Sequence, residues 1–439
     1  MASAPISLPQ HHHHSLQRRS YNSRCGLRSA ASPFGPACSS SSSERGSPSS
    51  GGVVYRSSMD TSKTKQGPDH LLILVHGIMA SPSDWTYGEA VLKRRLGDNF
   101  FIYASSSNIY TRTFDGIDMA GRRLADEVSD VVRKMSSLRK ISFLAHSLGG
   151  LFARYAISIL YSPETKNTGQ SGARNVPTAR NSEKSQCTSE LGAIAGLEPI
   201  NFITLATPHL GVRGRNQVDH QNVLNYLPFL QGLSVLEKLA APLAPLIVGR
   251  TGAHLFLTDG EPSKPPLLLQ MASDREDKKF IVALSTFKNR ILYANLAPDM
   301  VGWRTSSIRR EKDLIKPLHR SLNGYKHIVN VEYCSPISSD GPHFPSKASR
   351  AKEAAQRTPN FENTEEYHKI MEEEMIHGLQ KVGWKKVDVN FHSSLWPYSA
   401  HNNMHVKNEW LHNAGAGVIA HVADSIKQQE SRPCLPANL

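Results

Sequence analysis

The sequence feature that most constrains the fold of this chain is a serine that lies between a short strand pattern and an apolar helix pattern. Residues 140–150 read KISFLAHSLGG, with apolar side chains alternating along the first half as in a buried strand. In residues 151–160 an apolar position recurs every fourth residue, which predicts one face of a helix. Strand, serine turn and helix form the layout of a nucleophile elbow. The sequence therefore predicts Ser147 as a nucleophile, with Ala145 where the usual pattern G-x-S-x-G has glycine.

Strand and helix patterns alternate on both sides of this elbow. Such alternation predicts an α/β protein with a mostly parallel central sheet and helices on both faces, and the elbow makes it an α/β-hydrolase fold. The strands are expected at 71–75, 101–105, 141–146, 201–209, 289–297 and 385–393. Helices are expected from about Ile117, at 151–160, near 367–382, and at the end of the chain with Ile419, Val422 and Ile426 on one face.

The predicted hydrolase domain covers residues 66–430 and is followed by a tail at 431–439. Insertions are expected at about 162–196, 213–275 and 304–384. Residues 222–249 are apolar, with only Glu237 and Lys238 as charges, and prolines divide them into short helices. This apolar helical insertion is either a lid over the site or additional core, and the sequence favours neither.

Residues 1–65 differ in composition from the rest of the chain. The first 60 residues contain 17 serines, several arginines and no acidic residue before Glu44, so they cannot build a core. An acid-poor, Ser- and Arg-rich start is typical of a disordered organelle transit peptide, and the serine density favours the chloroplast. An inert tail on a cytoplasmic protein is the alternative. Part of the net charge of +13 lies in this segment. The sequence has no basic stripe with interleaved aromatic residues, so it does not predict nucleic-acid binding.

No residue pattern in the sequence predicts a metal or another cofactor. The five cysteines share no motif spacing, and histidines 11–14 are too few and too isolated to predict a metal site. No apolar run reaches the length of a membrane span.

A serine nucleophile needs a histidine base, and the base needs an orienting carboxylate. In a hydrolase sheet the chain order is serine, acid, histidine, with acid and base in loops after later strands. Asp299 follows the 289–297 strand and His401 follows the 385–393 strand, so they are the predicted acid and base. Asp259 is a rival acid that no clear strand precedes, and Asp388 lies inside a strand pattern, which indicates a structural role.

The predicted oxyanion hole consists of two main-chain N–H groups. One is the N–H of Leu148, directly after the nucleophile, and the other comes from the loop after the first strand. Gly77 allows a sharp turn there, which favours Ile78 as the donor over Met79. For the base, His405 lies four residues from His401 and remains an alternative.

Several motifs resemble the DUF676 family of serine esterases, with its plant members the most similar. The resemblance covers residues 69–428, and its motifs are LVHGIMASPSDW, SFLAHSLGGLFARYA, NFITLATPHLG, LYANLAPDMVGWRTSSIRR and the segment from His401 to His421. It implies an α/β-hydrolase fold, a serine nucleophile and an acyl-ester or lipid substrate. By motif position it also assigns Ser147, Asp299 and His401 to the triad.

Together these patterns predict a serine hydrolase that cleaves the carboxylic ester of a lipid through an acyl-serine intermediate. Its partner is the lipid or acyl-ester substrate, and transient contact with a membrane surface is compatible with that role. Thioesterase or small-ester activity is one alternative. Another is a non-enzymatic protein of the same fold that binds an apolar ligand or a partner. Such a protein need not keep serine, acid and histidine in order.

Overall fold

The structure is a computed structural model of the 439-residue chain. It describes residues 67–163, 192–212, 249–260, 264–296, 302–310, 313, 320–322, 324–337 and 361–430. The predicted transit segment 1–65, nearly all of the apolar segment 222–249, the acid candidate Asp299 and the tail 431–439 lie outside the described residues.

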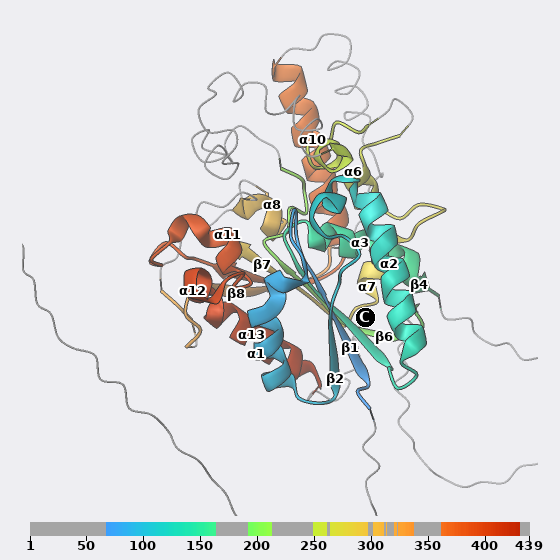
Figure 1. Cartoon of the computed structure of the whole chain (residues 1–439). Coiled ribbons are helices and arrows are strands. Elements are labelled where there is room, and N and C mark those ends of the chain that lie inside the picture. Colours follow the sequence, from blue (N-terminus) through green and yellow to red (C-terminus); the bar gives the residue numbers. More distant parts are fainter. Residues whose placement is uncertain are drawn as a thin grey trace, which may run out of the picture. The chain divides into compact units, whose positions relative to one another are not determined.

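A seven-stranded sheet forms the centre of the described part of the chain (Figure 1). The strand order is β2-β1-β3-β6-β7-β9-β8, and every pairing is parallel except that of β8 with β9. The strands span His70–Val75 (β1), Phe100–Ala104 (β2), Lys140–His146 (β3), Glu198–Leu205 (β6), Asn289–Asn295 (β7), Ile328–Cys334 (β8) and Trp384–Val389 (β9). The predicted mostly parallel sheet is confirmed.

Helices cover both faces of the sheet, as predicted (Figure 1). On one face lie α2 (Ile117–Lys134), α3 (Gly149–Leu160), α6 (Leu267–Gln270), α7 (Phe280–Ser285) and α10 (Phe361–Gln380). On the other lie α1 (Thr86–Leu96) and α13 (Ala416–Glu430). The alternation of side chains along each strand sorts the core between the two faces: Phe143 packs towards α2 and α3, and Leu144 packs towards α1 and α13. No helix within the described ranges is long and apolar enough to cross a membrane.

Shorter elements connect these layers. They are the 3₁₀ turns η1 (Pro82–Trp85), η2 (Tyr110–Phe114), η5 (Pro397–Ser399) and η6 (Asn413–Gly415), the helices α8 (Trp303–Ser307), α11 (Ala400–Asn403) and α12 (Glu409–His412), and the small antiparallel pair β4 (Tyr161–Ser162) and β5 (Ala193–Ile194). Strand β8 lies within the predicted 304–384 insertion and was not expected. Its segment IVNVEYC alternates apolar and polar residues, and it adds an antiparallel edge to β9.

Candidate active site

The topological switch point of the sheet lies between the carboxyl ends of β1 and β3. From β1 the chain crosses to β2 on one side, whereas β3 pairs with β1 on the other side. Loops that leave two such neighbouring strands diverge, and the crevice between them is where open α/β sheets bind ligands. Ile78 follows β1 and Ser147 follows β3, so both lie at this switch point.

Ser147 occupies a strained turn between strand and helix. Its φ is +54°, a left-handed conformation that few non-glycine residues adopt. The turn is fixed on both sides, since the Ser147 N–H donates to the Leu205 carbonyl of β6 (2.8 Å) and its carbonyl accepts from the Gly150 N–H (3.1 Å). A serine in this strained conformation, directly between a strand and a helix, is the geometry of a nucleophile elbow. The predicted strand–serine–helix turn is therefore present in the structure.

Glycines allow the segments around Ser147 to approach closely. A Cβ at Gly77 would lie 2.8 Å from the Ser147 Cβ and 3.3 Å from its Oγ. A Cβ at Gly149 would lie 2.5 Å from the carbonyl oxygen of His76 and 2.6 Å from that of Val75. These distances are too short for a side chain, so glycine is required for the loop after β1 to lie directly against the serine turn.

Two main-chain N–H groups beside Ser147 have no acceptor within the part of the chain that the structure describes: those of Ile78 and Leu148. The N–H of Met79, in contrast, donates to the Thr113 Oγ1 (3.1 Å). The Met79 donor is thus already occupied, whereas the Ile78 donor is available. An unoccupied pair of N–H groups flanking a nucleophile has the composition of an oxyanion hole.

Histidines gather on the face of β3 opposite α3. The ring of His146, the last residue of β3, lies 4.6 Å from the ring of His401 in α11 and stacks on that of His405 at 3.8 Å. His146 Nε2 also donates to the main-chain carbonyl of His401 (3.0 Å). The segment after β9 that contains α11 and His405, here called the turn after β9, therefore contacts the residue directly before Ser147. Both base candidates lie in this turn.

His405 and His401 differ in their surroundings. His405 lies deeper, with its ring edge-on to that of Trp85 (5.4 Å). Burial, and then the nearby charges of His401 and Lys407, hold the pKa of His405 well below its ordinary range. A histidine that cannot readily accept a proton is a poor general base. This environment favours His401 over His405 as the base.

His76, directly after β1, is buried with its Nδ1 3.1 Å from the Gly77 carbonyl. Burial lowers its pKa, and the hydrogen bond to Gly77 offsets part of this effect.

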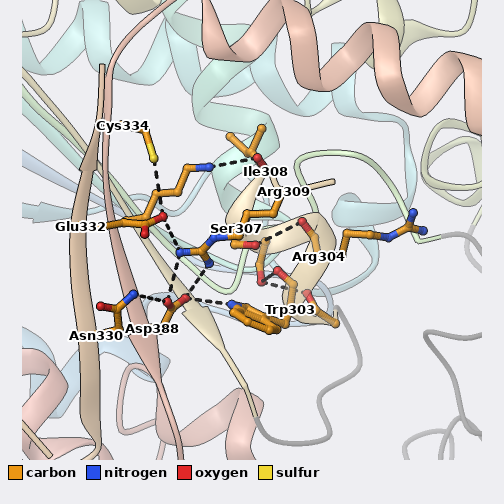
Figure 2. Close-up of polar contacts among 12 residues, drawn as sticks. Trp303, Arg304, Ser307, Ile308, Arg309, Asn330, Glu332, Cys334 and Asp388 are labelled. Atoms are coloured by element: carbon orange, nitrogen blue, oxygen red, sulfur yellow. Dashed lines mark hydrogen bonds and ion pairs between the residues drawn. The ribbon is translucent and has the colours of Figure 1, made fainter. Parts of the chain in front are cut away.

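Two of the three carboxylates considered from the sequence already have partners. Asp388 is fully buried in β9, where it pairs with both terminal nitrogens of Arg309 (2.7 and 3.1 Å) and accepts from the Trp303 Nε1 (2.8 Å). Figure 2 shows the Arg309 guanidinium between Asp388 and Glu332. Asp388 is a structural carboxylate, in agreement with its position inside a strand.

The rival acid Asp259 accepts from the Leu267 N–H (2.8 Å) and lies 3.8 Å from the His254 Nε2. Its histidine neighbour is therefore His254, whose Nδ1 accepts from the N–H of Ile117 at the start of α2. For Asp299, no geometry tests its predicted role, because it lies outside the described residues.

His146 is the site residue that sequence reasoning overlooked. Its signal was the alternation of β3: Ile141, Phe143 and Ala145 face α2 and α3, so His146 must face the opposite side. Nothing in the local sequence indicates that His401, 255 residues further along the chain, lies against His146 on this side of the sheet.

Comparison with known proteins adds a family to this geometry. The model of the family described as "Putative serine esterase (DUF676)" matches residues 65–308, which is more than half of the chain. The chain belongs to the DUF676 family.

Curated relatives of this DUF676 protein are fungal. It is 29% identical over 235 residues to "Putative lipase YDL109C" and 28% identical over 287 residues to "Putative lipase ROG1", both from Saccharomyces cerevisiae. These alignments cover 52% and 63% of this chain but only 28% and 34% of the relatives. The chain therefore spans about a third of the length of these relatives.

Solved structures with a similar arrangement include the lipase BlEst2 from Bacillus licheniformis in mature form. It shares 15% identity, with a TM-score of 0.28, over 53% of this chain and 67% of that one. The thioesterase RedJ from Streptomyces coelicolor shares 12% identity, with a TM-score of 0.26, over 55% of this chain and 74% of that one. The α/β-hydrolase assignment rests on the strand order, the elbow and the family.

Proposed function

We propose that this protein is a serine hydrolase that cleaves a carboxylic ester, most readily that of a lipid, through an acyl-serine intermediate. One observation carries the proposal: Ser147 is held at a φ of +54° at the switch point of the sheet, beside the two unoccupied N–H groups of Ile78 and Leu148. The family supports serine esterase chemistry, and the names of the fungal relatives support a lipid substrate.

In the proposed reaction the Ser147 Oγ attacks the ester carbonyl carbon while His401 accepts the hydroxyl proton. The carbonyl oxygen becomes an oxyanion that accepts hydrogen bonds from the N–H groups of Ile78 and Leu148. Asp299 orients His401 and stabilises its protonated form. Collapse of the tetrahedral intermediate breaks the C–O bond, and His401 returns the proton to the leaving alcohol. Water then repeats these steps on the acyl-serine and releases the carboxylic acid.

Exposed apolar side chains near the turn of His401 support a lipid substrate over a polar one. Leu395 is 94% exposed and Trp396 is 57% exposed in the loop that leads to α11, and Trp410 of α12 is 87% exposed. The Asn403 side chain lies 3.5 Å from the Trp396 carbonyl, which places this loop against α11. Indole side chains suit the boundary between water and lipid, because they combine a large apolar ring with one polar N–H group.

The direct test is hydrolysis of p-nitrophenyl esters by the full chain and its variants. Ser147→Ala should lower kcat by about 10⁶-fold while the protein remains folded. His401→Ala should lower kcat by a similar order, and His405→Phe should retain far more activity. Loss of activity in His405→Phe with retention in His401→Ala would assign the base to His405. Full activity in Ser147→Ala would refute the proposal, and no activity in the wild-type protein would favour the non-enzymatic alternative.

A series of acyl-chain lengths tests the preference for lipids. Each methylene that the protein buries contributes about 0.8 kcal/mol, or roughly fourfold in kcat/KM. If the apolar segment 222–249 caps the site, kcat/KM should rise by orders of magnitude from butyrate to decanoate esters. A flat or falling series would contradict a lipase-like site and favour a small-ester hydrolase.

A further inference from the structure

His146 joins the two halves of the candidate site through one hydrogen bond. It is the last residue of β3 and immediately precedes Ser147. Its Nε2 lies 3.0 Å from the main-chain carbonyl oxygen of His401, which is 255 residues away in the sequence. The side chain is 4% exposed, so water cannot readily replace this partner.

The hydrogen bond shows which nitrogen of the His146 ring carries the proton. A carbonyl oxygen can only accept, so Nε2 must carry the proton. Burial, and then the neighbouring His405 and His401, hold the pKa of His146 well below its ordinary range, which keeps the ring neutral. A neutral ring with its proton on Nε2 leaves Nδ1 unprotonated. His146 therefore donates through Nε2 to the main chain of His401.

The turn that carries His401 depends on contacts from outside. Helix α11 has only four residues, and its N-cap Ser399 makes no capping hydrogen bond with its side chain. A helix this short is not stable alone. Contacts further along fix the rest of the turn: the His405 ring packs against Trp85, and Lys407 pairs with Asp84 (2.9 Å). The residue next to the nucleophile, His146, contributes the hydrogen bond to His401 and the ring contacts with His401 and His405.

We propose that His146 is a positioning residue: its Nε2–H holds the main chain of His401 in register with Ser147. This inference rests on the proposed hydrolase function, with Ser147 as nucleophile and His401 as base. Because His146 is covalently next to Ser147, a shift of β3 moves nucleophile and base together. Their separation is thus protected from small movements of the loop between β9 and α11.

The expected cost of losing this bond follows from the geometry of proton transfer. A misplacement of about 1 Å between reacting groups can lower the rate by about 100-fold. Without the donor, the buried carbonyl of His401 would have to move towards another donor, and it would carry the side chain of His401 along. The loss should appear in kcat rather than in KM, because His146 positions the base and does not touch the substrate.

Three substitutions separate the hydrogen bond from the packing of the ring. His146→Phe keeps an aromatic ring that can stack on His405 but removes the donor. His146→Met also removes the donor while its flexible side chain fills the space, which guards against failure of the first variant to fold. His146→Gln keeps an amide N–H near the position of Nε2 and should restore the bond.

His70 supplies a matched control. It is fully buried at the start of β1, at the opposite edge of the sheet, and its Nε2 lies 2.7 Å from the Ser142 Oγ of β3. His70→Phe removes a different buried histidine hydrogen bond, which also involves β3. It should lower stability without a specific effect on kcat.

The experiment measures kcat and KM on p-nitrophenyl butyrate, the rate of labelling by a fluorophosphonate, and the thermal midpoint of each full-length variant. We expect His146→Phe and His146→Met to lower kcat and the labelling rate by about 10- to 100-fold. His146→Gln should recover most of both rates, and His70→Phe should keep wild-type rates.

Wild-type rates in the Phe and Met variants would overturn the inference, as would a Gln variant as slow as they are. An equal loss of rate in His70→Phe would also overturn it, because the effect would then follow stability alone. These outcomes differ from failure of the proposed function, in which the wild-type protein itself would show neither turnover nor labelling.

Discussion

A single methyl group at Gly149 should separate the two halves of the oxyanion hole. Gly149 lies in the first turn of α3, where a Cβ would meet the carbonyl oxygens of His76 and Val75 at 2.5 and 2.6 Å. Both are main-chain atoms at the end of β1, so no side-chain rotation can relieve the contact. To reach an ordinary contact of 3.4 Å, the end of β1 and the start of α3 must separate by about 0.9 Å.

This displacement acts on the two proposed oxyanion donors, because Leu148 precedes Gly149 and Ile78 follows β1. A shift of about 1 Å between catalytic groups can lower the rate by about 100-fold. Overpacking of this kind also lowers the free energy of unfolding by about 1–3 kcal/mol. We therefore expect Gly149→Ala to lower kcat/KM for p-nitrophenyl butyrate by about two orders of magnitude. Urea unfolding of the same sample should show that it remains folded.

Gly196→Ala is the control for the loss of stability. Gly196 has a φ of +75° and open space around its Cβ position, so alanine there is strained without any steric contact. The strain should lower the free energy of unfolding by about 1–2 kcal/mol and leave kcat/KM unchanged. Wild-type kcat/KM in Gly149→Ala would refute the argument that close approach of β1 and α3 sets the oxyanion geometry.

Two further predictions concern stability. Asp388→Asn removes the fully buried one of the two carboxylates that pair with Arg309, so it should lower the free energy of unfolding by up to about 5 kcal/mol in urea titrations although Glu332 remains. Glu373→Gln, which breaks the exposed ion pair with Arg310, should cost less than about 1 kcal/mol, and equal costs would contradict the structural role of Asp388. Burial lowers the pKa of His421 from 6.5 to about 4, so between these values the unfolded chain binds more protons and the free energy of unfolding falls as pH falls. His421→Gln should reduce that slope by up to about 1.4 kcal/mol per pH unit, and an unchanged slope would show that His421 is not held neutral.

The elbow could be predicted from the sequence because its signals are local. Alternating apolar residues, a serine and a helix pattern follow one another within residues 140–160, and the structure has them as β3, Ser147 and α3. The positions of the later strands along the chain were also predictable, since β6 and β7 are short runs rich in apolar residues that a parallel sheet buries on both faces. Ile78 was preferred over Met79 from Gly77 alone, and the bond from Met79 to Thr113 supplies a reason that the sequence does not contain.

The remaining features depend on contacts between distant segments. The pairing of β8 with β9 and the bond from His146 to His401 follow from how the chain returns to the sheet, which local patterns do not encode. The same applies to the deeper position of His405, because two histidines four residues apart look alike in sequence. What separates them is the packing of His405 against Trp85 and His146.

The most direct test of the central claim is to identify the residue that a fluorophosphonate modifies. The reagent should be added to the full-length protein in its folded state and in urea, and the labelled peptide mapped by mass spectrometry. A hydroxyl is nucleophilic only where a base and an oxyanion hole surround it, so the label requires the folded site. We predict one label, on Ser147, in the folded protein, and none after unfolding or in Ser147→Ala. A label on another serine, or persistent labelling of Ser147→Ala, would contradict the assignment of Ser147 as the nucleophile.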